Sequence, residues 1–240
     1  MFATIKDFLT KSAPQSGGVI VPEELAVLPM VQVGLIVDNS TSIRSTNCVE
    51  AVCCGHNQFV EKLRQSPAAA RILITTVTIH GEYFNRSVPA EEAKLVQPDG
   101  FLIQAGTPMF AAMIREIRNI RAWDIQQQGK DILSLTIMVS DGDERPRLQG
   151  QRFPVAAVCT GVEMAILTGR HCFGAYGIDN GYADFREVFT AMGIPEAWIM
   201  TSAREPDDIY AAFARLSDTA SRASTSSEAF AQTSHSGFGH

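Results

Sequence analysis

The chain has 240 residues, of which 45% are hydrophobic and 19% are charged, and its formal net charge is −6. This length fits one domain, and the apolar content is sufficient for a buried core, so wholesale disorder is excluded. The acidic balance argues against a nucleic acid or an anionic membrane surface as the main partner.

In chain order, residues 1–30 are predicted to form an N-terminal extension, because Pro14, Pro22 and Pro29 interrupt regular structure. The β-branched run 31–37 is typical of a strand buried on both faces. Further strands are predicted over 71–79, 86–96 (a weak edge strand), 132–139, 171–178 and 197–201, and helices over 47–65, 108–122, 155–168, 184–193 and 206–221. The domain is assigned to residues 31–216, and the Ser/Thr/Gly-rich residues 217–240 are predicted to be a flexible tail.

Strands that alternate with helices predict an α/β domain, with a mostly parallel sheet and helices on both faces. In such sheets, ligands bind at the carboxyl ends of the strands. Three polar segments are expected there. They are Asp38-x-Ser40-x-Ser42 after the first strand, Gly-Thr-Pro with Thr107 before a helix, and Ser-Asp-Gly with Asp141 after the 132–139 strand.

These segments offer carboxylate and hydroxyl oxygens and neither histidine nor thiolate. Hard oxygen donors of this kind suit Mg²⁺ or Mn²⁺, and Ca²⁺ less well because carboxylates are few. Alternate residues leaving a strand point the same way, so Asp38, Ser40 and Ser42 can converge on one ion. Thr107 and Asp141 can add a fourth and a fifth oxygen and leave one position open for a partner's carboxylate.

The order and spacing of these residues resemble the metal-ion-dependent adhesion site (MIDAS) of von Willebrand factor A (vWA) domains. The resemblance covers roughly residues 31–216. It implies a three-layer, doubly wound, six-stranded sheet with 86–96 as a short antiparallel edge strand. It further implies that Ser40, Ser42 and Thr107 bind metal, and that Asp38 and Asp141 do so directly or through water.

Two residues depart from the usual family pattern: Thr41 stands where Gly is common, and Ser140 where Thr is commoner. A β-branched Thr41 is expected to strain a backbone with positive φ. Within the family, the Gly-Thr-Pro loop and compact length look like the bacterial, cytoplasmic TerY-like group of tellurite-resistance and stress operons. That group is associated with a protein kinase and a protein phosphatase, which are the partners this resemblance implies.

The sequence therefore predicts a non-enzymatic, metal-dependent protein-binding module, with a partner's Asp or Glu completing the metal shell. Asp143, Glu144 and Arg145 follow the Asp141 loop and are predicted to form the partner-binding rim. One alternative is a vWA partner of a MoxR-type ATPase. The other is a magnesium-dependent phosphatase of the haloacid dehalogenase type that uses Asp38, although Ser40 stands where such enzymes have a second aspartate.

Simpler interpretations accompany these. Asp, Ser and Thr after strands are ordinary helix caps and turn formers when each segment is taken alone. His56 is expected to be a packed core histidine on the apolar face of its helix. The five cysteines include a vicinal Cys53–Cys54 pair and do not follow a secreted disulfide pattern, and no apolar run reaches transmembrane length. A soluble, cytoplasmic protein is therefore expected.

Overall fold

A computed structural model describes residues 29–45, 47–126, 132–141 and 144–239. Most of the predicted N-terminal extension, residues 1–28, thus lies outside the described residues. The six strands are β1 (Met30–Val37), β2 (Ile72–Thr78), β3 (Tyr83–Pro89), β4 (Ile132–Ser140), β5 (His171–Ile178) and β6 (Ile199–Ser202). The α-helices are α1 (Thr41–Ser45), α2 (Val49–Arg64), α3 (Met109–Gln126), α4 (Val155–Ile166), α5 (Phe185–Ala191), α6 (Pro206–Ala223) and α7 (Ser227–Ser236).

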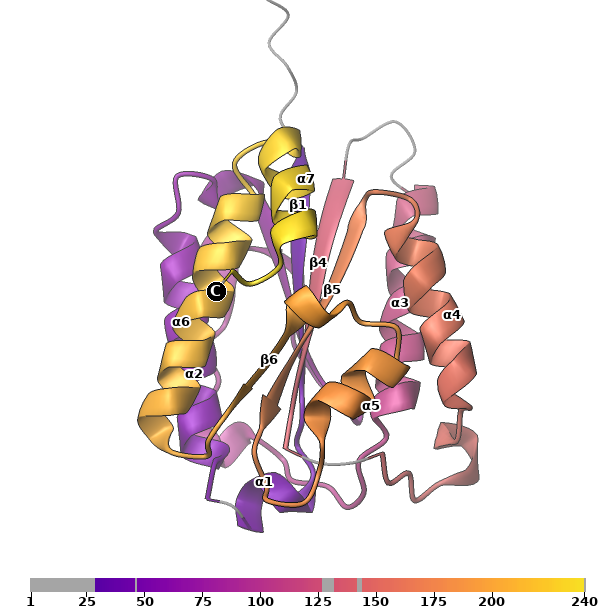
Figure 1. The fold of residues 1–240 in the computed structure, drawn as a ribbon. Coiled ribbons are helices and arrows are strands. Elements are labelled where there is room, and N and C mark those ends of the chain that lie inside the picture. The colour runs from indigo at the N-terminus through magenta and orange to yellow at the C-terminus, as the bar shows by residue number, and fades with distance from the viewer. Residues whose placement is uncertain (1–28, 46, 127–131, 142–143, 240) are drawn as a thin grey trace, which may run out of the picture.

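The strands form one sheet in the order β3-β2-β1-β4-β5-β6. The pairs from β2 to β6 are parallel, and β3 runs antiparallel to β2 at one edge. Figure 1 shows α2, α6 and α7 on one face of the sheet and α3, α4 and α5 on the other. This three-layer architecture confirms the predicted fold class.

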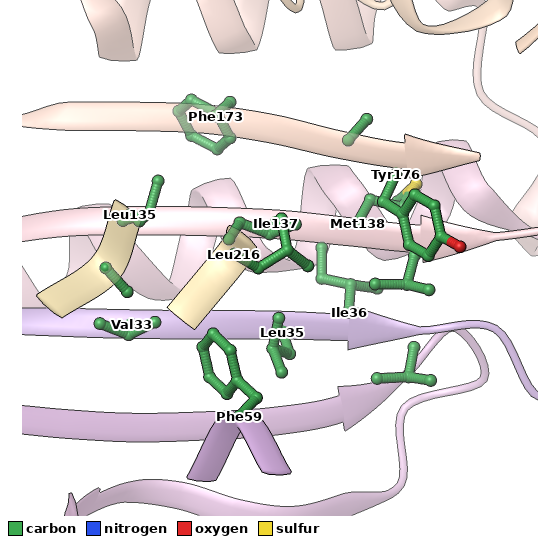
Figure 2. Close-up of a cluster of buried hydrophobic side chains, with 14 of the residues drawn as sticks. Val33, Leu35, Ile36, Phe59, Leu135, Ile137, Met138, Phe173, Tyr176 and Leu216 are labelled. Atoms are coloured by element: carbon green, nitrogen blue, oxygen red, sulfur yellow. The ribbon is translucent and has the colours of Figure 1, made fainter. Parts of the chain in front are cut away.

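The central strands are buried on both faces, which explains their continuous apolar sequence. Every residue of β4 and β5 is buried. Figure 2 shows how Phe59 of α2 and Leu216 of α6 lie beside the β1 and β4 side chains Leu35 and Ile137. All four side chains are fully buried, so this cluster fixes the helical layer on the sheet.

The edge strand lies earlier in the chain than predicted. β3 begins at Tyr83, which pairs with Val77 of β2, and it ends at Pro89. Proline has no amide hydrogen to continue a ladder, so the strand stops there, and residues 90–92 form a 3₁₀ turn instead. The antiparallel direction and the edge position agree with the expectation.

The predicted flexible tail is corrected by the structure. Helix α6 continues to Ala223, and α7 packs against it. Phe230 is 2% exposed, and Phe238 is 6% exposed with its ring 5.0 Å from that of Trp198. Several of the small side chains that suggested a solvated tail, such as Ser217, Ala220 and Ser224, are buried, and their small size permits close packing. Their hydroxyls bond to helix carbonyls, as Ser224 Oγ does to Ala220 O at 2.7 Å.

In the described part of the chain, no helix is both long enough and apolar enough to cross a membrane.

Candidate metal centre

The three polar segments meet at one edge of the sheet. Val37 of β1 is paired with Val139 of β4, so the residues that follow these strands leave the sheet side by side. The Asp38 amide donates a hydrogen bond to Val139 O at 2.9 Å. In Figure 1, α1 lies just beyond the carboxyl ends of β1, β4, β5 and β6. The parallel sheet thus brings Asp38 and Asp141 together from positions about a hundred residues apart.

Short hydrogen bonds join the side chains of this cluster. The Ser42 hydroxyl donates to Asp141 Oδ1 at 2.7 Å, and the Ser40 and Ser42 hydroxyl oxygens lie 2.7 Å apart. Asp38 Oδ1 accepts from the Ser40 amide at 2.7 Å, and Asp38 Oδ2 accepts from the Ser140 hydroxyl at 2.5 Å. Four of the five predicted ligands therefore lie in one connected cluster of oxygens.

The cluster is buried and acidic. Asp38 and Asp141 are both fully buried. Burial raises the pKa of Asp38, while hydrogen bonds from Ser140 and Ser40 act in the opposite direction. Among the described residues, Asp38 takes part in no ion pair. A buried carboxylate without a countercharge is stabilised by a cation, so this donor set fits a hard divalent metal.

Thr107 reaches the same site from the loop before α3. Its backbone pairs with that of Arg145 through two hydrogen bonds of 2.9 Å, which forms an isolated antiparallel bridge. Gly106 has a φ of +91°, and a Cβ there would lie 2.9 Å from Arg145 O, so only glycine fits. Thr107 and Ser42 line one pocket of about 610 Å³ that opens over the cluster.

Thr41 does not carry the expected strain. It begins α1, and the only described non-glycine residues with positive φ are Asn47 and Ser87. The loop after β1 therefore enters a helix directly and does not need a left-handed residue at position 41. Ser140 supplies the hydroxyl that bonds Asp38, so serine at this position keeps a donor to the carboxylate.

The predicted partner-binding rim is placed only in part. Asp143 lies outside the described residues. The Glu144 carboxylate turns inward and accepts from the Phe110 amide at 2.9 Å, at the N-terminus of α3. Burial raises the pKa of Glu144 to about 7, and its Oε1 has no hydrogen-bond partner among the described residues. Arg145 is exposed and lines the pocket.

Sequence reasoning missed several residues of the pocket. Asn180 follows β5 and donates from Nδ2 to Asp141 O at 2.5 Å, so the strand-end rule extended to β5 would have found it. Arg147, Tyr182 and Arg204 also line the pocket, but they come from loops whose paths the sequence does not predict. No three described His, Cys, Asp or Glu side chains gather as a metal site, since hydroxyls supply most donors of this cluster.

His56 is confirmed as a core residue. It is 2% exposed, and its ring nitrogens lie 3.0 Å from Asn57 Oδ1 and 3.0 Å from Thr76 Oγ1. Burial lowers its pKa to about 4. It is therefore a neutral, hydrogen-bonded packing residue.

The sequence matches no family profile and no curated protein sequence. Its fold, however, is similar to several solved structures. The pilus adhesin SpaC from Lactobacillus rhamnosus GG, in its open conformation, superposes with a TM-score of 0.61 and 14% identity, over 82% of this chain and 30% of SpaC. The chain thus spans less than a third of that adhesin.

The vWF domain of the type V pili tip protein Mfa5 from Porphyromonas gingivalis gives a TM-score of 0.59 and 15% identity, over 81% of this chain and 96% of that domain. The mussel byssus protein PTMP1, solved with a zinc-occupied MIDAS motif, gives a TM-score of 0.53 and 11% identity, over 81% of this chain and 46% of PTMP1. At such identities the likeness establishes the fold and not the activity. The chain has a vWA-like α/β fold.

Proposed function

We propose that this chain is a non-enzymatic protein-binding module whose buried oxygen cluster holds Mg²⁺ or Mn²⁺. When bound, the cation supplies an open coordination position that attracts a carboxylate of a partner protein. Asp38, Ser40, Ser42, Thr107 and Asp141 are the residues that would hold it. The observation that carries this proposal is the hydrogen-bonded cluster around two fully buried aspartates, beneath an open pocket.

Serine groups around the proposed metal site orient the two carboxylates by hydrogen bonds. Ser140 and the Ser40 amide orient the Asp38 carboxylate. Ser42 orients that of Asp141. Such hydrogen bonds hold ligands in place before the metal arrives, and their loss typically lowers metal affinity about 10–100-fold. The rigid sheet edge therefore presents a site with little freedom to reorganise.

A phosphatase is not favoured by this geometry. The residue two positions after Asp38 is Ser40, whose hydroxyl is engaged with Ser42 at 2.7 Å. A serine hydroxyl cannot serve as the general acid that such a reaction needs near neutral pH. The module is accordingly proposed to bind and not to catalyse.

The cellular setting is proposed on the sequence resemblance alone. A bacterial, cytoplasmic module of a tellurite-resistance or stress system would have a protein kinase and a protein phosphatase as partners. A partner of a MoxR-type ATPase is the other setting within the same family. The genes next to the coding sequence distinguish the two: a kinase and a phosphatase support the first setting, and a MoxR-type gene overturns it.

The metal site is tested by Mn²⁺ binding to the full chain, measured by electron paramagnetic resonance with Mg²⁺ as competitor. Wild type is expected to bind Mn²⁺ reversibly, and Asp38→Asn and Thr107→Ala to bind it about 10–100-fold more weakly. Asp179→Asn is the matched control, because Asp179 is an exposed aspartate that also follows a strand of this edge. Equal binding by wild type and Asp38→Asn would refute the site.

Function is tested by capture of partner proteins on the immobilised full chain, with Mg²⁺ or with EDTA. Capture that requires both the metal and Asp38 supports the module. Capture that ignores both contradicts it. Hydrolysis of p-nitrophenyl phosphate that is lost in Asp38→Asn would instead establish the enzyme.

A further inference from the structure

The described residues that line the pocket over the candidate metal centre carry positive charge, whereas the chain as a whole is acidic. The chain carries a formal charge of −6. The described residues that line the pocket include Arg145, Arg147 and Arg204 and no Asp or Glu. The aspartates of the metal centre lie buried beneath it. A positively charged opening on an acidic molecule indicates selection of a negatively charged ligand.

The first wall of this pocket is held firmly against the metal centre. The Thr107–Arg145 bridge ties the arginine segment to a predicted metal ligand through two backbone hydrogen bonds. Arg147 Cγ occupies the space beside Gly106, where a Cβ would lie 2.9 Å away. Both arginines are exposed, so their guanidinium groups reach solvent from a fixed backbone.

The second wall is the loop after β5. Asn180 anchors this loop by donating to Asp141 O, and its own Oδ1 accepts from the Tyr182 amide at 2.8 Å. The Tyr182 side chain is 92% exposed. The Arg204 guanidinium lies beside the same loop, 3.5 Å from where a Cβ of Gly181 would stand. Arginine and tyrosine are among the residues enriched at the energetic centres of protein interfaces.

Two of these arginines are available for a partner. Among the described residues, neither Arg147 nor Arg204 takes part in an ion pair. Their guanidinium groups present planar forks of donors that match carboxylates in two-point contacts. A ligand with a single carboxylate would direct it to the metal, and the guanidinium groups of Arg147 and Arg204 would have no carboxylate to pair with.

We propose that the pocket selects an acidic protein segment: one carboxylate of the segment enters toward the metal centre, and neighbouring Asp or Glu side chains pair with Arg147 and Arg204. This inference rests on the function proposed above and names the chemistry of the partner. Tyr182 adds apolar contact with the peptide. A nucleic acid is disfavoured, because the rest of the molecule is acidic and would repel a long polyanion.

The test uses fluorescence anisotropy with labelled hexaglutamate and with a control peptide that has one Glu among glutamines. Both are measured against the full chain in Mg²⁺ and in EDTA. The test variant is Arg147→Gln/Arg204→Gln. The matched control is Arg121→Gln/Arg215→Gln, which removes the same charge from exposed positions that do not line the pocket. All four positions are exposed, so the fold should persist, and circular dichroism checks this.

Hexaglutamate is expected to bind the pocket variant about tenfold more weakly than wild type, and the control variant within twofold of wild type. The single-Glu peptide should respond to EDTA but not to the arginine substitutions. Binding of hexaglutamate to wild type should also weaken more steeply with added salt than binding to the pocket variant.

The possible failures are distinct. If EDTA abolishes hexaglutamate binding but the pocket variant binds as wild type does, the acidic-segment proposal is overturned and the metal function stands. If the arginines matter and EDTA does not, the metal function is overturned and selection by the arginines is supported. If inorganic phosphate or a single-stranded oligonucleotide competes better than unlabelled hexaglutamate, the choice of a carboxylate partner is wrong.

Discussion

At the scale of single residues, the buried carboxylate of Asp38 determines the chemistry of the candidate site. Asp38 is fully buried, and its two oxygens accept hydrogen bonds from neutral groups, the Ser40 amide and the Ser140 hydroxyl. Neutral donors compensate a buried negative charge incompletely. The site therefore holds charge that a cation can neutralise, which costs stability in the metal-free protein.

His56 shows the opposite arrangement, a titratable group kept neutral inside the core. Burial lowers its pKa to about 4, whereas in an unfolded chain the value is near 6.5. Between these values the unfolded state binds more protons, so the free energy of unfolding falls as the pH decreases from about 6.5 to about 4. The loss attributable to His56 is about 3 kcal/mol.

We therefore expect His56→Gln to flatten the pH dependence of stability across this window, since a neutral amide can replace the hydrogen bond to Thr76. Urea unfolding at pH 7 and pH 4.5, compared between wild type and variant, measures the difference and cancels the contributions of other groups. His235→Gln is the control, because His235 is exposed. Parallel pH profiles for wild type and His56→Gln would contradict the assignment.

At the scale of elements, the sequence predicted the strands and helices of the domain well because central parallel strands are long apolar runs, as 31–37 and 132–139 are. After position 217, the amino-acid composition did not predict the helices that the structure contains. Serine, threonine and alanine favour a solvated tail, but they also allow helices to pack closely, and only the tertiary partner decides. Ser217, Ala220 and Ser224 of this region are at most 1% exposed.

Phe238 is expected to contribute to stability although it stands near the end of the chain. It is 6% exposed, its ring packs edge-on against Trp198, and its amide bonds to Ala197 O at 3.1 Å. Phe238→Ala should lower the free energy of unfolding by about 3 kcal/mol, through lost burial and the cavity it leaves. Denaturant unfolding measures this.

Tyr182→Ala is the matched control for that measurement. It removes an aromatic ring that is 92% exposed, so a change within about 0.5 kcal/mol is expected. If Phe238→Ala changed the free energy of unfolding as little as Tyr182→Ala, the segment around Phe238 would be a solvated tail and not part of the core.

At the scale of the whole molecule, one rule accounts for what the sequence could predict of the site. Parallel strands end at a common edge, so Asp38 and Asp141 could be placed together before any coordinates were known. The same rule does not reach Arg147, Tyr182 and Arg204, because the loops that carry them are positioned by tertiary contacts such as the Thr107–Arg145 bridge. Asp143 stays a prediction.

The proposed metal site would couple metal binding to the stability of the entire domain. Metal bound only by the folded state adds about 2.7 kcal/mol at a concentration a hundred times its Kd. For a domain of this size that corresponds to a Tm increase of about 5–10 °C. Scanning calorimetry of wild type with Mg²⁺ and with EDTA measures this shift.

Asp38→Asn should raise the Tm of the metal-free protein and reduce the Tm increase that Mg²⁺ gives. Because burial raises the pKa of Asp38, the ionised carboxylate destabilises the metal-free fold at pH 7, and a neutral amide of the same shape should raise its Tm in EDTA. The variant should then gain much less Tm than wild type from the same Mg²⁺ concentration, because its metal binding is expected to be about 10–100-fold weaker. A variant less stable than wild type in EDTA would show that the Asp38 charge stabilises the fold without metal. An unchanged Mg²⁺ shift would place the ion elsewhere on the molecule.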